Sequence, residues 1–360
     1  MAATVHIDAN RTWGGGQAQS LGLATALAAG GERTHFIVQV GSALAARLEG
    51  TDLPWEGASL RGLSGALAVG RLSRRLGELA PQVVHVHDSA SHAMAGVATR
   101  RAGSARIVVT RRTEFPVRGS WLGRLKYDRW CDRLICISEA VRRRCLEGGV
   151  PADRMVVIPD FVDCAHFDPA VMGSVERNES PTIAMVGRLT HSKGHGVLLR
   201  AMKGVLRAVP NARLVISGEG EEEASLRREA ELQGVAGHVE FAGFVPDVRA
   251  VLGAADVFVM PSLEEGLGVA VLEAMAMAKP VVVSNAGGLP EAVAQGETGL
   301  ICAAGDAEAL AEALVSLLTD PERARKMGEA GRARARREFD KPRVVERVSA
   351  LYESVLAGGQ

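Results

Sequence analysis

A short apolar strand runs into a glycine-framed turn and then into a helix, an order typical of layered α/β folds. The pattern is PSLEEGLGVAVLEAMA at residues 261–276, and it directly follows the apolar run 257–260. Gly266 and Gly268 allow the chain to turn, and residues 269–277 are good helix formers. Free N–H groups gather at such a helix start and attract anions. The stretch therefore predicts a phosphate site.

Two carboxylates accompany this helix start. Glu265 lies in the turn and Glu273 about one helical turn beyond it. Each could take hydroxyl groups flanking a phosphate held at the helix start, which implies a phosphorylated sugar or nucleotide as ligand. A plainer interpretation is that Glu273 only favours the helix dipole and that Glu265 is solvated. The spacing of both with the glycines favours the ligand.

The run EGLGVAVLEAMA, with its two glutamates separated by seven residues, resembles the signature of retaining glycosyltransferases of family 4 (group 1). That family has the GT-B fold, an α/β architecture of two Rossmann-like, doubly wound parallel-sheet domains that face a cleft. The resemblance implies transfer of a sugar from a nucleotide-diphosphate sugar, with Glu265 contacting the sugar and Glu273 the ribose. It is strongest over residues 181–306. The donor-binding residues that it implies in this motif are Glu265, Gly266, Leu267, Gly268, Val269 and Glu273.

The length of 360 residues exceeds what one hydrophobic core usually serves, so we expect two domains. By resemblance, residues 1–159 form an acceptor-binding domain, 160–170 a linker and 171–339 a nucleotide-sugar-binding domain. Residues 340–360 form a helix that crosses back to the first domain. The linker pattern departs from the family's Pro-Asn-Gly-Val-Asp, because Asp160 and Phe161 replace the Asn and Gly.

Compartment follows from what the sequence lacks. No apolar run reaches the roughly 18 residues of a membrane span, and Asp8 and Arg11 interrupt the apolar start, so we expect no signal peptide. Five scattered cysteines without a CxxC pair argue against a disulfide framework or a zinc site. We expect a cytoplasmic enzyme.

The N-terminal strand TVHIDAN leads into a glycine loop and a helix, yet the loop lacks the GxGxxG spacing of a dinucleotide site. We therefore expect no dinucleotide cofactor. By resemblance Gly15 and Gly16 face the diphosphate and the acceptor, although a plain tight turn is the alternative. Further strands are expected at THFIVQV, VVHVH, RIVVT and RLICIS. His87, at the end of VVHVH, contacts the donor sugar by resemblance, whereas His85 is expected to pack inside.

The second domain begins with the strand TIAMV and a loop that carries Gly187, Arg188 and Lys193. Arg can bind phosphate through two parallel donors and Lys adds a compact charge, so the pair could neutralise a leaving pyrophosphate. The family assigns this work to the matching pair, and places the base near Phe244 and Val245. No Asp-x-Asp clamp is present, so we expect no obligatory metal. The expected catalytic set is Arg188, Lys193, Glu265 and His87.

Positive charge concentrates in residues 100–144, which hold 13 Lys and Arg against four acids. This region could hold an anionic acceptor or lie against anionic lipid, with Trp121 at the interface. A solvated face, or an amphipathic helix with buried aromatics, is the alternative. We expect a glycan or lipid-linked anionic acceptor, as in polysaccharide or lipopolysaccharide synthesis, peripheral contact with the inner membrane face, and no nucleic-acid partner. The acceptor-binding candidates are Arg111, Arg112 and Arg118.

Other functions remain open at this point. An oxidoreductase would need the dinucleotide fingerprint that is missing. A noncatalytic sugar-nucleotide-binding protein of the same fold would bind the donor without turnover. A nucleotide-sugar epimerase or a phosphorylase would use the same fold and the same donor pocket.

Overall fold

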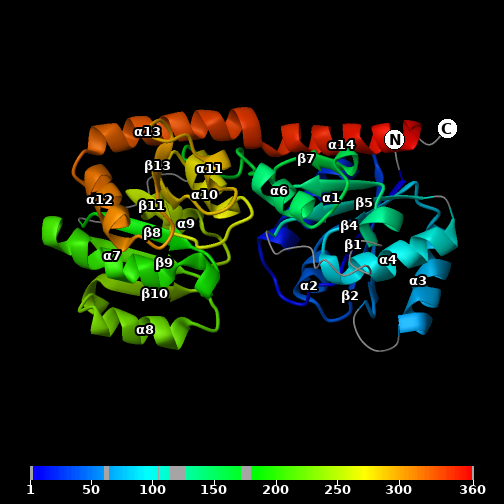
Figure 1. Cartoon of the computed structure of the whole chain (residues 1–360), viewed down its shortest axis with the longest axis horizontal. Coiled ribbons are helices and arrows are strands. Elements are labelled where there is room, and N and C mark those ends of the chain that lie inside the picture. Colours follow the sequence, from blue (N-terminus) through cyan, green and yellow to red (C-terminus); the bar gives the residue numbers. More distant parts are fainter. Residues whose placement is uncertain (1–2, 61–64, 104, 114–125, 172–179, 359–360) are drawn as a thin grey trace. The chain divides into compact units, whose positions relative to one another are not determined.

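The computed structural model describes residues 3–60, 65–103, 105–113, 126–171 and 180–358. The chain divides into two units, which Figure 1 shows coloured along the sequence. Unit 1 comprises Met1–Asp160 and Lys341–Gln360, and unit 2 comprises Phe161–Asp340. The C-terminal helix thus belongs to the unit that begins the chain.

Unit 1 is built on a parallel seven-stranded sheet within the described residues, in the order β3-β2-β1-β4-β5-β6-β7. Val and Ile dominate its central strands, as expected where helices cover both faces. The five strands expected from the sequence are confirmed, whereas β3 and β7 were not predicted. The strand β3 lacks an apolar run, and β7 lies beside the segment interpreted as a domain boundary. The strands are β1 (Ala3–Asp8), β2 (Arg33–Gln39), β3 (Trp55–Ala58), β4 (Val83–Val86), β5 (Arg106–Arg111), β6 (Arg133–Cys136) and β7 (Met155–Val157).

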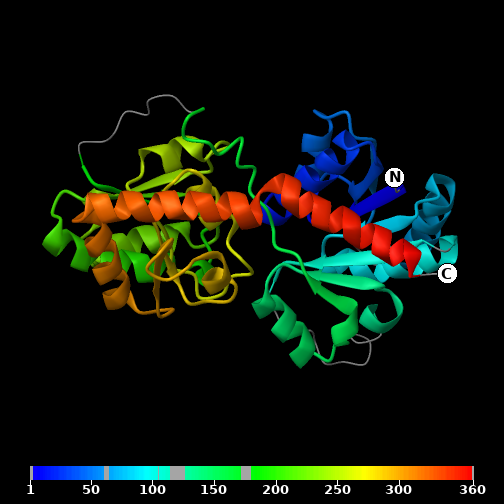
Figure 2. The ribbon, with the colours of Figure 1, turned by 90° about the horizontal axis from the view of Figure 1, so that it is seen from above.

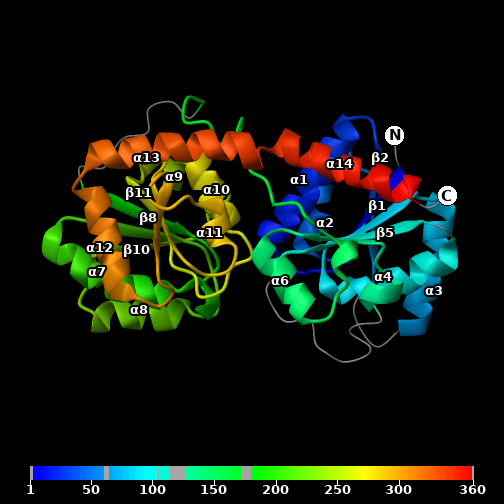
Figure 3. The ribbon, with the colours of Figure 1, turned by 45° about the horizontal axis from the view of Figure 1, so that its top comes forward.

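Several helices of unit 1 begin at a capping side chain. Ser42, Asp88 and Ser138 accept backbone N–H bonds at the starts of three helices. The C-terminal helix α14 lies beside α1 (Figure 3). The helices are α1 (Gly15–Ala29), α2 (Ala43–Leu48), α3 (Gly65–Leu79), α4 (Ser89–Ala102), α6 (Glu139–Glu147) and α14 (Lys341–Ala357), with a 3-10 turn at Ala152–Arg154.

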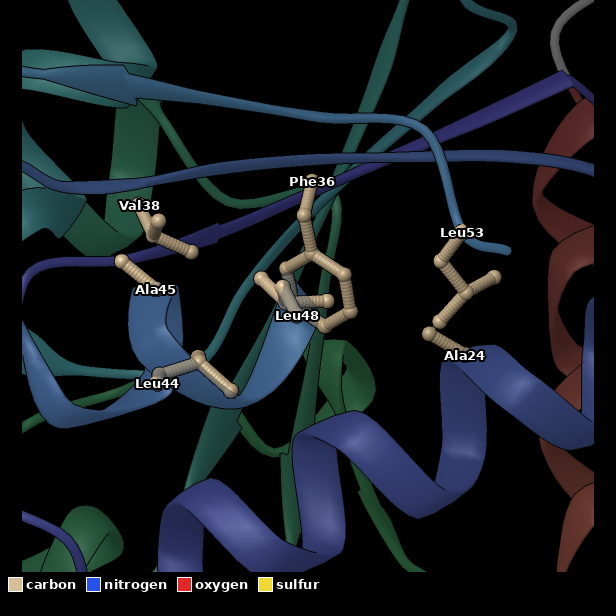
Figure 4. Packing of buried hydrophobic residues seen from close by; sticks show 7 residues of the cluster. All are labelled: Ala24, Phe36, Val38, Leu44, Ala45, Leu48 and Leu53. Atoms are coloured by element: carbon tan, nitrogen blue, oxygen red, sulfur yellow. The ribbon is translucent and has the colours of Figure 1, made fainter. Parts of the chain in front are cut away.

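One part of the unit 1 core lies between β2 and the two helices beside it. Phe36 and Val38 point from β2 toward α2, and Ala24 of α1 completes the cluster from below (Figure 4). The remaining members are Leu44, Ala45, Leu48 and Leu53, and every member is at most 7% exposed. This packing fixes the sheet from which the loops of unit 1 project.

The described part of unit 2 contains a parallel six-stranded sheet in the order β10-β9-β8-β11-β12-β13. In each sheet the strand order reverses once, between β1 and β4 in unit 1 and between β8 and β11 in unit 2. Ligands of doubly wound sheets bind at the carboxyl ends of the strands at such a switch point. The strands are β8 (Thr182–Val186), β9 (Arg213–Ser217), β10 (Val239–Gly243), β11 (Val257–Met260), β12 (Val281–Ser284) and β13 (Gly299–Cys302).

Helices cover this second sheet as well. The helix α12 packs along α7, and α13, the orange helix that runs along unit 2 in Figure 2, packs on α10. Among the described residues no helix is both long and apolar enough to cross a bilayer. The helices are α7 (His195–Ala208), α8 (Glu223–Leu232), α9 (Arg249–Ala254), α10 (Val269–Ala276), α11 (Leu289–Ala292), α12 (Ala307–Leu318) and α13 (Pro321–Arg334), with 3-10 turns at His191–Lys193 and Ala236–His238 and a π-helix at Ala335–Phe339.

Candidate active site

Two loops meet at the switch point of unit 2, one after β8 and one after β11. The N–H groups of Leu263 and Glu264 donate to the carbonyl oxygen of Ser192 at 2.7 and 3.2 Å. Gly194 adopts a left-handed conformation with φ +72°, and a Cβ atom there would lie 2.0 Å from the carbonyl oxygen of Pro261. Only glycine allows this approach. The contact brings the cationic loop of β8 next to the carboxylate loop of β11.

The loop that carries Arg188 is held from its other side by the turn after β9. A Cβ atom on Gly218 would lie 1.9 Å from the carbonyl oxygen of Gly187, and one on Gly220 would lie 2.3 Å from that of Leu189. These two glycines have no ligand-binding signature of their own. Their role is visible only in the packing of two backbones.

Lys193 and Glu265 form an ion pair where these loops meet. Lys193 Nζ lies 2.5 Å from Glu265 Oε2, and the side chains are 24% and 11% exposed. The hydroxyl of Ser262 donates to the same Oε2 at 3.3 Å. Within the described residues, the other oxygen, Oε1, has no hydrogen-bond partner. It is therefore available to a ligand.

Arg188 is the more exposed of the two expected cations. Its side chain is 59% exposed, and Nη2 lies 3.7 Å from Glu221 Oε2, a carboxylate that is itself 68% exposed. Exposed pairs of this kind contribute little. The guanidinium can therefore turn to an anionic ligand at small cost.

The start of α10 carries the donors that the sequence predicted. In the part of the chain that the structure describes, the N–H groups of Leu267, Gly268, Val269 and Ala270 donate no hydrogen bond to the protein. Gly268 caps the helix with φ +90°. Such N–H groups and the helix dipole together attract an anion. Gly266, also part of the expected set, is buried just before them.

Glu273 lies on α10 with its side chain partly exposed, and in the described residues it makes no hydrogen bond or ion pair. Burial raises the pKa of its carboxyl to about 8. A carboxyl without a protein partner beside an anion site is suited to ligand hydroxyls.

At the carboxyl end of β10, the expected base-binding residues are accessible, since Phe244 is 48% exposed and Val245 is partly exposed.

His87 follows β4 at the switch point of unit 1. Its Nε2 lies 2.8 Å from Nδ1 of His6. His85 is bonded through both ring nitrogens, with Nδ1 2.6 Å from the hydroxyl of Tyr352 and Nε2 2.7 Å from that of Thr110. Burial holds the pKa of all three imidazoles below the usual value, so they are neutral. His87 is only 5% exposed, and its contact with a sugar stays a prediction.

The three imidazoles are close enough to raise the question of a metal, since one nitrogen of each lies within 4.8 Å of the others. Two nitrogens bound to one tetrahedral zinc ion lie about 3.3 Å apart. The His6–His87 distance of 2.8 Å is shorter, and hydroxyl groups occupy both nitrogens of His85. The cluster fits a hydrogen-bonded arrangement better than a metal centre.

Asp8, at the carboxyl end of β1, is a polar site residue that the sequence did not single out. Its carboxylate accepts from Asn10 N at 2.8 Å and from Gln17 Nε2 at 3.1 Å. Burial, and after it the charge of Asp88, raises the pKa of Asp8. Only its place at the end of a strand at the switch point could have pointed to it.

The expected acceptor-binding arginines are mostly inside unit 1. Arg111 is 9% exposed and donates to the hydroxyl of Tyr127 at 3.0 Å. Arg112 Nε lies 2.9 Å from Asp160 Oδ1, with both side chains largely buried. These two arginines therefore do not form the exposed cationic face that their sequence suggests. Arg118 and Trp121 lie outside the described residues.

The glycine loop of unit 1 lies near one of these arginines. Gly15 and Gly16 are the first residues of α1, and a Cβ atom on Gly16 would lie 3.6 Å from Cδ of Arg112. The expected role of this loop at the diphosphate and the acceptor stays a prediction.

Known protein families and relatives match both units of this chain. Residues 172–334 match the family described as Glycosyl transferases group 1, and residues 13–166 match Glycosyltransferase Family 4. A GDP-mannose-dependent alpha-(1-6)-phosphatidylinositol monomannoside mannosyltransferase from Mycolicibacterium smegmatis is 34% identical over 283 residues, 73% of this chain and 74% of that protein. Alpha-maltose-1-phosphate synthase from the same organism is 35% identical over 263 residues, 66% of this chain and 67% of that protein.

Solved structures show the same architecture. Anabaena HepE in complex with UDP and glucose has a TM-score of 0.87 at 19% identity, over 98% of this chain and all of that one. The apo form of the lipopolysaccharide outer core galactosyltransferase WaaB has a TM-score of 0.75 at 16% identity, over 98% and 99% of the two chains. These likenesses concern the fold, and they confirm the expected GT-B architecture. The chain therefore belongs to glycosyltransferase family 4 and is a glycosyltransferase, as its paired glutamates predicted.

Proposed function

We propose that the enzyme transfers a hexosyl group from a nucleotide-diphosphate sugar, with GDP-mannose as the first candidate donor. The observation that carries the donor class is the group of N–H donors at the start of α10, which bond to no residue that the structure describes, beside the Lys193–Glu265 pair. GDP-mannose is chosen because the names of several relatives specify it, including those 34% and 37% identical to this chain.

Each part of the site has a task in this proposal. The diphosphate lies at the start of α10, where Arg188 and Lys193 meet the negative charge that grows as the sugar bond breaks. Glu265 takes sugar hydroxyls and Glu273 takes the ribose hydroxyls. Phe244 and Val245 support the base. Backbone donors are fixed before the reaction, so they need not reorganise as charge develops.

We further propose retention of anomeric configuration without an obligatory metal. Glu265 is engaged by Lys193 and is therefore a poor covalent nucleophile. Same-face attack lets the leaving diphosphate take the proton of the acceptor hydroxyl as the new glycosidic bond forms. Proton NMR of the first product tests retention, and an inverted anomer would reject it. Metal independence is tested by measuring turnover after exhaustive chelation, and loss of activity would reject it.

The acceptor we propose is a lipid-linked anionic glycan or phosphoglycolipid, handled by unit 1 with His87 and the Gly15–Gly16 loop. Phosphatidylinositol monomannoside is the first compound to test, because relatives that act on it match most of this chain. Salt-sensitive peripheral contact with the inner membrane face would follow. Liposome sedimentation at low and high salt, with anionic and neutral lipid, tests it. A water-soluble acceptor would be favoured if the protein does not pellet, or if its pelleting depends on neither salt nor lipid charge.

The deciding experiment combines binding with turnover. A thermal-shift screen of GDP-mannose, UDP-glucose and ADP-glucose identifies the donor, since a ligand at about 100 times its Kd adds about 2.7 kcal/mol of stability. Acceptor-dependent release of nucleoside diphosphate then shows transfer. Conversion of the donor without acceptor would indicate an epimerase of the same fold instead. Stabilisation without any turnover would indicate a binding protein.

A further inference from the structure

We infer that Ser262 is a positioning residue for Glu265 and so for recognition of the donor sugar, an inference that rests on the proposed function. Ser262 lies in the loop after β11 and is fully buried, so it cannot touch the substrate itself. Its hydroxyl donates to Glu265 Oε2 at 3.3 Å. The same oxygen accepts from Lys193 at 2.5 Å.

Two donors on one oxygen restrict the rotation of the carboxylate and leave the other oxygen for the ligand. The two oxygens of a carboxylate are equivalent and the terminal torsion of a glutamate is broad, so Lys193 alone would hold the carboxylate plane only loosely. The hydroxyl of Ser262 is a second donor to the oxygen that faces the protein, and it narrows that torsion. Oε1 then remains as the acceptor for sugar hydroxyls. A carboxylate fixed before binding costs less entropy on binding.

The backbone of this loop is anchored independently of the Ser262 hydroxyl. Ser284, at the end of β12, donates to the carbonyl oxygen of Ser262 at 2.5 Å. The N–H of Gly288 donates to the carbonyl oxygen of Glu265 at 3.0 Å. Removing the Ser262 hydroxyl should therefore free the carboxylate without moving the loop. Ser284 supplies a matched control, a buried hydroxyl bonded to the same loop but not to the carboxylate.

The test compares Ser262→Ala, Ser262→Thr and Ser284→Ala in the full-length enzyme. For Ser262→Ala, kcat/KM with the intact donor should fall about tenfold, equivalent to about 1.4 kcal/mol. Its Kd for the free nucleoside diphosphate should stay unchanged. Ser262→Thr keeps a hydroxyl and should restore most of the loss. Ser284→Ala should lower Tm and leave the ratio of donor to nucleotide affinity as in wild type.

A double mutant decides whether Ser262 acts through the carboxylate. In a Glu265→Gln background, Ser262→Ala should have no further effect, because coupled residues are not additive. The same tenfold loss in that background, an equal loss in Ser284→Ala, or no loss in the single Ser262→Ala variant would overturn the inference. A wild-type enzyme that turns over no nucleotide sugar would instead overturn the proposed function, and the inference with it.

Discussion

Replacing Glu273 by Gln should make the protein more stable at alkaline pH. Burial raises the pKa of this carboxyl from 4.5 to about 8 in the folded chain. Between those values the folded state keeps a proton that the unfolded state has released, so stability falls as pH rises through this window. The pKa difference of about 3.5 between the folded and unfolded chain corresponds to a loss of stability of at most about 4.8 kcal/mol. Because the side chain is partly exposed, solvent screening reduces this, and we expect about 1 to 3 kcal/mol.

Urea denaturation at pH 5, 6.5 and 8 measures this difference. Near pH 5 Glu273→Gln and wild type should have similar free energies of unfolding, and by pH 8 the variant should be the more stable. Glu265→Gln is the control. It removes a partner of Lys193, so its free energy of unfolding should not increase relative to wild type as pH rises. Parallel pH profiles for wild type and Glu273→Gln would refute the reasoning.

The same carboxyl links nucleotide binding to protons. Ribose hydroxyls that donate to Glu273 favour its ionised form, so binding of nucleoside diphosphate at pH 7 should release up to one proton per site. Calorimetry in two buffers of different ionisation enthalpy measures that release. The Glu273→Gln variant should release none. Equal proton release by both proteins would exclude Glu273 as its source.

Three further predictions concern turnover and stability. Arg188→Ala and Lys193→Ala should each lower kcat about a hundredfold, since these cations meet charge that develops in the transition state. Steady-state kinetics measures kcat, and a wild-type value in either variant would reject the role of that cation. Gly220→Ala should cost about 1 to 3 kcal/mol and lower kcat, because its Cβ would lie 2.3 Å from a carbonyl oxygen of the Arg188 loop. Thermal unfolding measures the loss beside Gly237→Ala, an exposed glycine with open space and no left-handed backbone, and equal Tm losses would contradict the packing argument. Tyr352→Phe should lower the free energy of unfolding by about 1 to 3 kcal/mol, because a buried nitrogen of His85 loses its hydrogen-bond partner. An unchanged free energy of unfolding would show that this hydrogen bond is dispensable.

Local pattern was enough to predict the strand, the turn and the helix on which the proposed donor site is built. The strand before residue 261, the glycine turn and the helix follow from residues close in the sequence, and α10 begins at Val269 as expected. Glu265, Arg188 and Lys193 stand out because charged residues at strand ends have few structural reasons to be there. The buried hydroxyl of Ser262 gave no such signal, since an isolated Ser in a loop has no periodicity or partner that a sequence displays.

The acceptor side shows the limit of that reasoning. Thirteen cations in residues 100–144 predicted an exposed basic surface, but charge counts do not reveal direction. Arg111 and Arg112 lie on and just after a central strand and bond to Tyr127 and Asp160 inside the unit. Which arginines face solvent depends on the side of the sheet and on partners distant in sequence.

The sequence by itself determined the elements of this protein and the chemistry at their ends, because turns, caps and helix starts depend on neighbouring residues. Tertiary structure alone decided that the loops after β8 and β11 meet, although some seventy residues separate Lys193 from Glu265. That meeting depends on strand order, which is a property of the whole sheet. It also depends on the close backbone approach of Gly194 to Pro261, where a Cβ atom would lie 2.0 Å from the carbonyl oxygen. Pairing between distant strands leaves no local pattern, so only the folded chain places the ion pair at the helix start.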